Sequence, residues 1–223
     1  MKNKIKIASI IAIVFHAIGL AGILFCDKNL FAHTSWINLL LSFILIIYTQ
    51  EKITSGFIIF FISCFCIGMA AEIAGTSTGL LFGKYHYSHV LGYSIFKVPL
   101  IVGVNWFIVL YCAGIAMYML ANNLQKQVTA QSPAWLKAMA IICDTALLAV
   151  FFDWLMEPVA IKLGFWVWHD GGTVPFYNYI SWLVVSALLA CMFYVCSFPK
   201  QNKFAVNLLL IQGMFFLLIR TFL

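Results

Sequence analysis

The sequence predicts an all-α fold: a polytopic integral membrane helix bundle of about seven transmembrane helices, in which residues 1–223 form a single transmembrane domain. Hydrophobic residues make up 64% of the chain and charged residues only 9%, and the mean hydropathy is +1.02. These values lie far outside the range of soluble domains. Because each crossing helix needs roughly 20 residues, the chain has room for about six or seven crossings and for no separate extramembrane domain.

Apolar runs separated by charges, proline and glycine define the predicted spans. The first run has a basic head like that of a signal peptide, but it is about 20 residues long and no A-x-A cleavage site follows it, so we expect a retained first helix. The later breaks contain Lys28, Lys52, Gly92, Pro133, Gly164 and Pro199. The predicted spans, in order, are residues 5–25, 31–49, 53–74, 98–121, 135–160, 180–198 and 204–222.

The distribution of basic residues favours an N-in, C-out orientation, because cytoplasmic loops carry the excess of Lys and Arg. With a cytoplasmic N-terminus, eight of the 13 basic residues lie inside, namely Lys2, Lys4, Lys6, Lys52, Lys126, Lys137, Lys200 and Lys203. Five lie outside, namely Lys28, Lys84, Lys97, Lys162 and Arg220. Topology therefore accounts for the net charge of +6, and no basic stripe suggests a nucleic-acid partner.

The loops that follow the third and fifth spans, 75–97 and 161–179, leave the membrane on the same side, because both spans are odd-numbered. Both loops are rich in aromatic residues and histidine, which is typical of an interfacial aromatic belt. Their glycines raise the alternative that the loops fold back against the bundle in defined turns. The residues concerned are Tyr85, His86, Tyr87, His89, Tyr93, Trp166, Trp168, His169, Tyr177 and Tyr179.

Four acidic residues, Glu72, Asp144, Asp153 and Glu157, fall within predicted spans, where carboxyl groups are costly and usually paired or functional. Asp153 and Glu157 are four residues apart, so both lie on one helix face. Two carboxylates this close repel each other when ionised, which predicts that one keeps its proton at neutral pH, as a general acid must. Asp144 lies close to half a helical revolution from Asp153, and we interpret it as structural.

Pro158 follows the acidic pair directly and predicts a kink or an end of the helix, because proline lacks the N–H that would bond the carbonyl of Trp154. Glu72 lies at the exit of the third span, on the same side of the membrane. We therefore expect it to meet Asp153 and Glu157 in one pocket. A hydrogen-bonded packing network near the headgroups is the alternative interpretation of the same three acids.

The sequence lacks the residues that redox, metal-dependent or retinal-based chemistry would need. The seven cysteines show no C-x-x-C spacing. His86, His89 and His169 could suggest a metal, but the H-x-x-H of the first two lies in a glycine-rich loop without nearby Cys or acid ligands, so no metal is expected. The last span has no lysine for a retinal Schiff base. Acids with indole rings nearby instead favour acid-initiated alkene chemistry, in which a carboxylic acid protonates a double bond and aromatic faces stabilise the cation.

Two segments carry a resemblance to a known family. The first is E-x-x-G-x-x-T-G-x-x-F-G-x-Y-x-Y-x-x-x-L-G from Glu72 to Gly92, and the second is D-x-x-x-E-P-V-A-x-x-x-G-x-W-x-W from Asp153 to Trp168. With Pro99, Trp106, Pro175, Asn178 and Trp182, these segments resemble the integral-membrane "carotenoid biosynthesis protein" family. That family includes the CruF-type carotenoid hydratases and the bisanhydrobacterioruberin hydratases.

The resemblance implies addition of water to the terminal isoprenoid double bond of an acyclic carotenoid, without a cofactor or a metal. It implies a multi-pass protein of a bacterial or archaeal cytoplasmic membrane. The substrate would be a lipid-soluble carotenoid such as lycopene, and the partners would be membrane lipid and other carotenoid-pathway enzymes. Asp153 or Glu157 would donate the proton, and Glu72 and the remaining acid would orient water and balance the cation. The expected substrate-binding residues are Tyr85, Tyr87, Trp106, Trp154, Trp166, Trp168 and Asn178.

Two alternatives remain open at this point. A membrane lycopene cyclase would begin with the same protonation, but an internal double bond would capture the cation. Small helical cyclases of this kind are associated with a Pro-x-Glu-Glu or Pro-x-Glu-Asp motif, which this chain lacks. A non-enzymatic carotenoid-binding or assembly protein would need the aromatic lining but not the acids.

Overall fold

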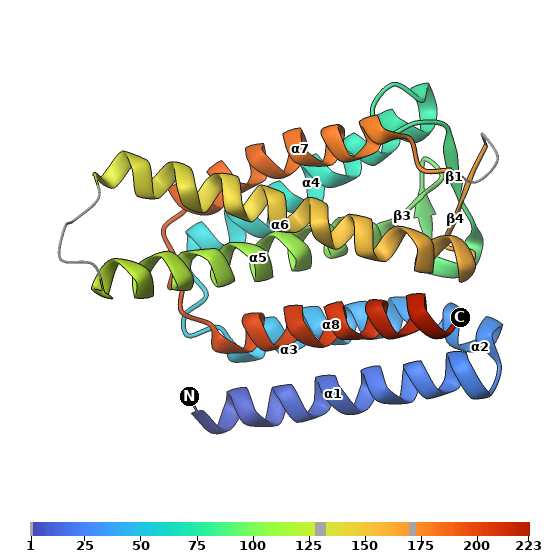
Figure 1. Cartoon of the computed structure of the whole chain (residues 1–223), viewed down its shortest axis with the longest axis horizontal. Coiled ribbons are helices and arrows are strands. Elements are labelled where there is room, and N and C mark those ends of the chain that lie inside the picture. The colour runs from blue at the N-terminus through green and yellow to red at the C-terminus, as the bar shows by residue number, and fades with distance from the viewer. Residues whose placement is uncertain (1, 128–132, 170–172) are drawn as a thin grey trace.

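The computed structural model describes residues 2–127, 133–169 and 173–223. These residues form an all-helical bundle with a few short strands at one end, which confirms the predicted fold class (Figure 1). The helices are α1 (Lys2–Phe25), α2 (Lys28–His33), α3 (Ser35–Thr49), α4 (Ser55–Thr78), α5 (Leu100–Gln127), α6 (Ala134–Lys162), α7 (Phe176–Val195) and α8 (Lys203–Phe222). The short elements are β1 (Tyr85–Tyr87), the 3₁₀ turn η1 (His89–Leu91), β2 (Ser94–Ile95), β3 (Val98–Pro99) and β4 (Trp166–Trp168).

Within the described ranges, six helices are long and apolar enough to cross a membrane, and α3, with 15 residues, is shorter. The predicted second span, 31–49, is broken at Thr34, whose hydroxyl donates a hydrogen bond to the carbonyl of Phe31 (2.9 Å). At 1.5 Å per residue, α3 is about 22 Å long, less than the roughly 30 Å of a hydrocarbon core. The chain nevertheless reverses direction at each successive long helix and at α3 (Figure 1).

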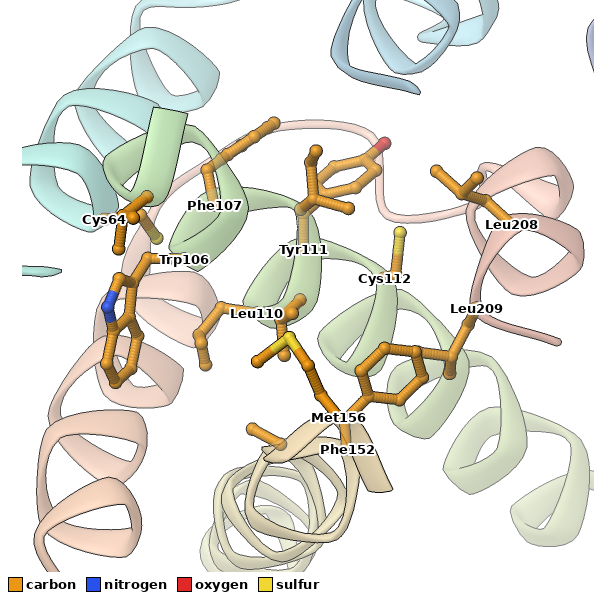
Figure 2. Close-up of a cluster of buried hydrophobic side chains, with 14 of the residues drawn as sticks. Cys64, Trp106, Phe107, Leu110, Tyr111, Cys112, Phe152, Met156, Leu208 and Leu209 are labelled. Atoms are coloured by element: carbon orange, nitrogen blue, oxygen red, sulfur yellow. The ribbon is translucent and has the colours of Figure 1, made fainter. Parts of the chain in front are cut away.

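Helix α5 lies at the centre of the bundle, with α1, α3 and α8 on one side and α4, α6 and α7 on the other (Figure 1). Residues 106–115 are buried without interruption, as expected of a helix that is hydrophobic all round. Figure 2 shows how this core is built: side chains of α5 meet those of α4, α6 and α8. The labelled core residues are Cys64, Trp106, Phe107, Leu110, Tyr111, Cys112, Phe152, Met156, Leu208 and Leu209.

The close approach of α4 and α5 depends on Gly68. A Cβ at this position would lie 2.5 Å from Cγ of Trp106, so only glycine leaves room for the indole. Small residues commonly permit such contacts between membrane helices. The consequence is that Trp106 sits against α4 one turn before Glu72.

The segments after α4 and α6 lie at the same end of the bundle, as the parity of the spans predicted, and there they pair with each other. β1 and β4 are antiparallel, with Tyr85 opposite Trp168 and Tyr87 opposite Trp166. These four rings face the bundle, while the residues between them, His86 and Val167, are exposed. We call this two-stranded unit the β-cap.

Gly164 directs the chain from α6 into the β-cap. It has a φ of +70°, the left-handed conformation that commonly ends helices. Its N–H bonds the carbonyl of Ile161 (3.1 Å), and the next N–H, of Phe165, bonds the carbonyl of Ala160 (2.9 Å). This turn brings β4 back beside β1, so the described parts of the two loops fold back against the bundle in defined turns.

Candidate active site

Helices α4 and α6 run in the same direction toward the β-cap (Figure 1). Glu72 lies in the second half of α4, and Asp153 and Glu157 lie in the second half of α6. Glu72, Asp153 and Glu157 are 4%, 2% and 3% exposed. Asp153 and Glu157 share one face of α6, one turn apart. All three carboxyl groups line one chamber, as the sequence predicted.

Glu72 accepts three hydrogen bonds from aromatic side chains. Trp106 Nε1 donates to Oε1 at 3.0 Å, Tyr87 Oη donates to Oε2 at 2.8 Å, and Tyr85 Oη also donates to Oε2. A carboxylate is an acceptor only, and this set of donors suits it. Both oxygens of Glu72 are therefore occupied.

Burial raises the pKa of the Tyr85 and Tyr87 hydroxyl groups well above their usual range, and the charge of Glu72 raises it further. Both residues belong to β1, outside the membrane-spanning helices. The two phenols consequently stay protonated near neutral pH and remain hydrogen-bond donors to Glu72.

Glu157 and Asp153 each keep one oxygen free of hydrogen bonds to described residues. Trp166 Nε1 and Trp168 Nε1 both donate to Oε2 of Glu157, at 3.0 Å and 3.1 Å. Asn178 Nδ2 donates to Oδ2 of Asp153 at 2.9 Å. The β-cap therefore positions Glu157 through two indoles, whereas a single amide from α7 positions Asp153.

Helix α6 does not end at Pro158 but continues for four residues, to Lys162. The missing N–H of Pro158 removes one hydrogen bond, the one to the carbonyl of Trp154, and leaves the flanking turns intact. Arg220 Nη1 of α8 lies 3.5 Å from that carbonyl oxygen. The proline thus leaves the acids within a continuous helix, with α8 beside the freed carbonyl.

The chamber holds about 940 Å³ of space between its lining atoms, including the part that is open to the outside. Its aromatic walls include Trp106 stacked on Trp182, with ring centroids 3.9 Å apart and planes 13° from parallel. Tyr85 lies 5.0 Å from Trp168, centroid to centroid. Among the described residues that line it, none is a lysine or an arginine, so no permanent cation offsets the three acids.

The structure brings nine of the ten predicted site residues to this chamber: Glu72, Tyr85, Tyr87, Trp106, Asp153, Glu157, Trp166, Trp168 and Asn178. The tenth, Trp154, lies outside it. Its side chain is 43% exposed on the surface of the bundle, and the Arg220 guanidinium packs over its ring at 4.1 Å. Asp144, interpreted from the sequence as structural, is exposed and also lies outside the chamber.

Several lining residues were missed by the sequence analysis, chiefly polar residues of other helices. His16 of α1, Asn38 of α3, Asn105 of α5 and Gln212 of α8 all face the chamber. Each interrupts an apolar stretch of its helix. Their position inside a predicted or observed span was the available signal, because polar side chains within membranes usually face the bundle interior.

Comparison with known proteins identifies the family. The sequence model of the family described as "Carotenoid biosynthesis protein" matches residues 33–223, which leaves only α1 and most of α2 outside the match. No curated protein and no solved structure matches the chain. Since the match covers most of the sequence, including every residue of the acid cluster, this multi-pass membrane protein belongs to the carotenoid biosynthesis protein family.

Proposed function

We propose that the protein is a carotenoid hydratase, which adds water to the terminal isoprenoid double bond of an acyclic carotenoid. The observation that carries this proposal is the convergence of three buried carboxyl groups in an aromatic chamber without a lysine or arginine in its described lining. Three negative charges buried together without a cation would be very unfavourable, so the chamber holds at least one carboxyl group in its acid form. That group is a proton donor in a site that is otherwise apolar.

Asp153 is the best candidate for the donor. It receives one hydrogen bond from the described residues, that of Asn178, whereas Glu157 receives two and Glu72 three. Because hydrogen bonds from neighbouring donors stabilise the ionised form of a carboxyl group, Asp153 has the least support for its anion. Its second oxygen, Oδ1, can carry the proton.

The reaction begins when the proton moves from Asp153 to the less substituted carbon of the terminal double bond. The electron pair of that bond forms the new C–H bond and leaves a tertiary cation on the adjacent carbon. The carboxylates of Glu72 and Glu157 oppose the positive charge, and the faces of Trp106 and Trp182 stabilise it as they do other cations. Water then forms a C–O bond to the cation, and loss of one of its protons, which restores the acid form of Asp153, yields a tertiary alcohol.

The proposed membrane orientation is N-in, C-out, as the distribution of lysines predicts. The acids and the β-cap would then lie toward the outer leaflet of a bacterial or archaeal cytoplasmic membrane. A lipid-soluble substrate reaches such a chamber without leaving the bilayer.

Expression of the chain in a lycopene-producing bacterium, with mass spectrometry of the extracted carotenoids, tests the function. A product heavier by one water supports the hydratase, whereas a ringed isomer of unchanged mass would identify the cyclase. Asp153→Asn should lower product formation by roughly 10²–10⁴-fold, the usual contribution of a general acid. Asp144→Asn is the matched control, because it makes the same change on the same helix outside the chamber.

Measurement of pigment binding distinguishes the hydratase from the binding or assembly alternative. If Asp153→Asn and wild type co-purify with the same unmodified carotenoid and neither forms an alcohol from lycopene or another acyclic carotenoid, the hydratase proposal fails. Retained binding with lost hydration in Asp153→Asn is the result that the proposal requires.

A further inference from the structure

The chamber has a second polar wall, formed by helices that do not carry the acids. His16 of α1 and Gln212 of α8 both line it and are each only 6% exposed. These two helices pack against one another on the side of α5 away from α4 and α7 (Figure 1). Within the described part of the chain, the Gln212 amide makes no hydrogen bond, and His16 uses only one of its two ring nitrogens.

The hydrogen bond of His16 fixes its tautomer. Its Nδ1 lies 2.8 Å from the carbonyl oxygen of Ala12, which can only accept, so Nδ1 carries the hydrogen. In a neutral imidazole the other nitrogen, Nε2, is then an acceptor with a free lone pair. Phe215 packs edge-on against the ring, with centroids 5.4 Å apart, and holds its orientation.

On the acid wall, formed by Glu72, Asp153 and Glu157, only Oε1 of Glu157 and Oδ1 of Asp153 accept no hydrogen bond from a described residue, and Oδ1 carries the proton in the proposed reaction. Both oxygens of Glu72 and one oxygen of Glu157 already accept hydrogen bonds from tyrosines and indoles. His16 offers a nitrogen acceptor that no described residue occupies, and Gln212 offers both a donor and an acceptor in the same chamber. These are the groups that can orient a water molecule and remove a proton from it.

We propose that His16, assisted by Gln212, binds the water that captures the cation and acts as its general base. This rests on the hydratase function proposed above. The water oxygen forms the C–O bond with its lone pair, and one of its protons passes to Nε2 of His16. The imidazolium returns that proton, through solvent in the chamber, to the carboxylate of Asp153, so the net change is one alkene plus one water to one alcohol.

α1 lies outside the region that the family match covers, residues 33–223. The proposal therefore assigns the first helix a part in the chemistry that the family match does not imply. Without a base on this wall, the cation can still form at the acid wall. It then loses a proton again, from the carbon just protonated or from a terminal methyl group, and returns an alkene.

The test measures both fates of the cation, hydration and return to an alkene. Purified protein in lipid vesicles is incubated with an acyclic carotenoid in deuterium oxide. Mass spectrometry measures deuterium in the recovered alkene and the amount of labelled alcohol. The ratio of the two does not depend on the amount of folded protein. The variants are His16→Leu, which removes the acceptor, and His16→Gln, which can hold water but cannot become a cation.

His33→Leu is the control. His33 makes the same bond from Nδ1 to a carbonyl four residues earlier, that of Asn29 at 2.8 Å, but it is exposed on α2 and does not line the chamber. We expect both His16 variants to raise the ratio of alkene exchange to hydration by at least about tenfold, a conservative figure beside the usual contribution of general-base catalysis. His33→Leu should leave the ratio unchanged.

An unchanged ratio in both His16 variants, with alcohol still formed, would overturn the assignment while leaving the hydratase intact. Loss of exchange and hydration together would also overturn it, because His16 would then support the protonation step or the fold. If wild type forms neither alcohol nor exchanged alkene from any acyclic carotenoid, the hydratase proposal itself fails, and the assignment fails with it.

Discussion

Removal of one hydroxyl group from the set that surrounds Glu72 gives a quantitative test of the site. Tyr87→Phe keeps the ring of β1 and deletes only the donor that lies 2.8 Å from Oε2 of Glu72. A hydrogen bond to a charged group contributes about 1.5–3 kcal/mol to stability. Two other donors to Glu72 remain, so the loss should lie in this range rather than include the full cost of an unpaired buried charge.

For a chain of this size, 1 kcal/mol corresponds to roughly 2–4 °C in Tm, so we expect Tyr87→Phe to unfold about 3–12 °C lower in detergent. Thermal unfolding followed by circular dichroism measures the shift. Tyr93→Phe is the control, because Tyr93 is an exposed tyrosine of the same connection. It should change Tm by no more than about 2 °C, as expected of a surface substitution.

A double-mutant cycle that combines Tyr87→Phe with Glu72→Gln measures the interaction energy between these two side chains. The amide oxygen that this substitution introduces would accept a neutral hydrogen bond worth about 0.5–1.5 kcal/mol, so the cycle should give a coupling of about 1–2 kcal/mol between the two positions. A coupling near zero, or equal shifts for Tyr87→Phe and Tyr93→Phe, would refute the reasoning that Glu72 is a carboxylate held by these donors.

Two further predictions concern the β-cap and the packing beneath it. The pKa of Tyr85 and Tyr87 is raised in the folded protein. Their contribution to folding stability is therefore complete below the ordinary tyrosine pKa of about 10 and is lost as the pH rises above it. Tm measured from pH 8 to 11 should fall more steeply in wild type than in the variant that carries both Tyr85→Phe and Tyr87→Phe. Gly68→Ala places a Cβ 2.5 Å from Cγ of Trp106 and should cost about 1–3 kcal/mol, whereas Gly213→Ala, with its nearest neighbour at 3.7 Å, should be close to neutral in the same thermal assay.

The features that were predictable from the sequence are those set by short-range periodicity. Apolar runs predicted the long helices, and the spacing of Asp153 and Glu157 placed both on one face of α6. The parity of the spans placed the connections after α4 and α6 at one end, where β1 and β4 pair. That these connections would pair as strands was not predicted, because each strand has only three residues.

The short helix α3 shows where hydropathy alone is insufficient. Residues 31–49 are apolar enough to be counted as one span, but the chain turns at Thr34. Asp27 caps α2 by accepting hydrogen bonds from the N–H groups of Asn29 and Leu30, which starts a separate helix of six residues. The run that a window average treats as continuous therefore contains the end of one helix, a turn at Thr34 and a second helix.

Trp154 and His16 illustrate opposite limits of reasoning from sequence about a site. Trp154 is adjacent to Asp153, but successive residues on a helix point about 100° apart, and its ring faces the outside of the bundle rather than the acids. His16 is far from Asp153 along the chain, and no motif connects them. It lines the same chamber only because α1 packs on α8 and α8 packs on α5 and α6. Neighbours along a helix are therefore weak evidence for a shared site, whereas a lone polar residue in an apolar span is evidence for an interior position even when its partners cannot be named.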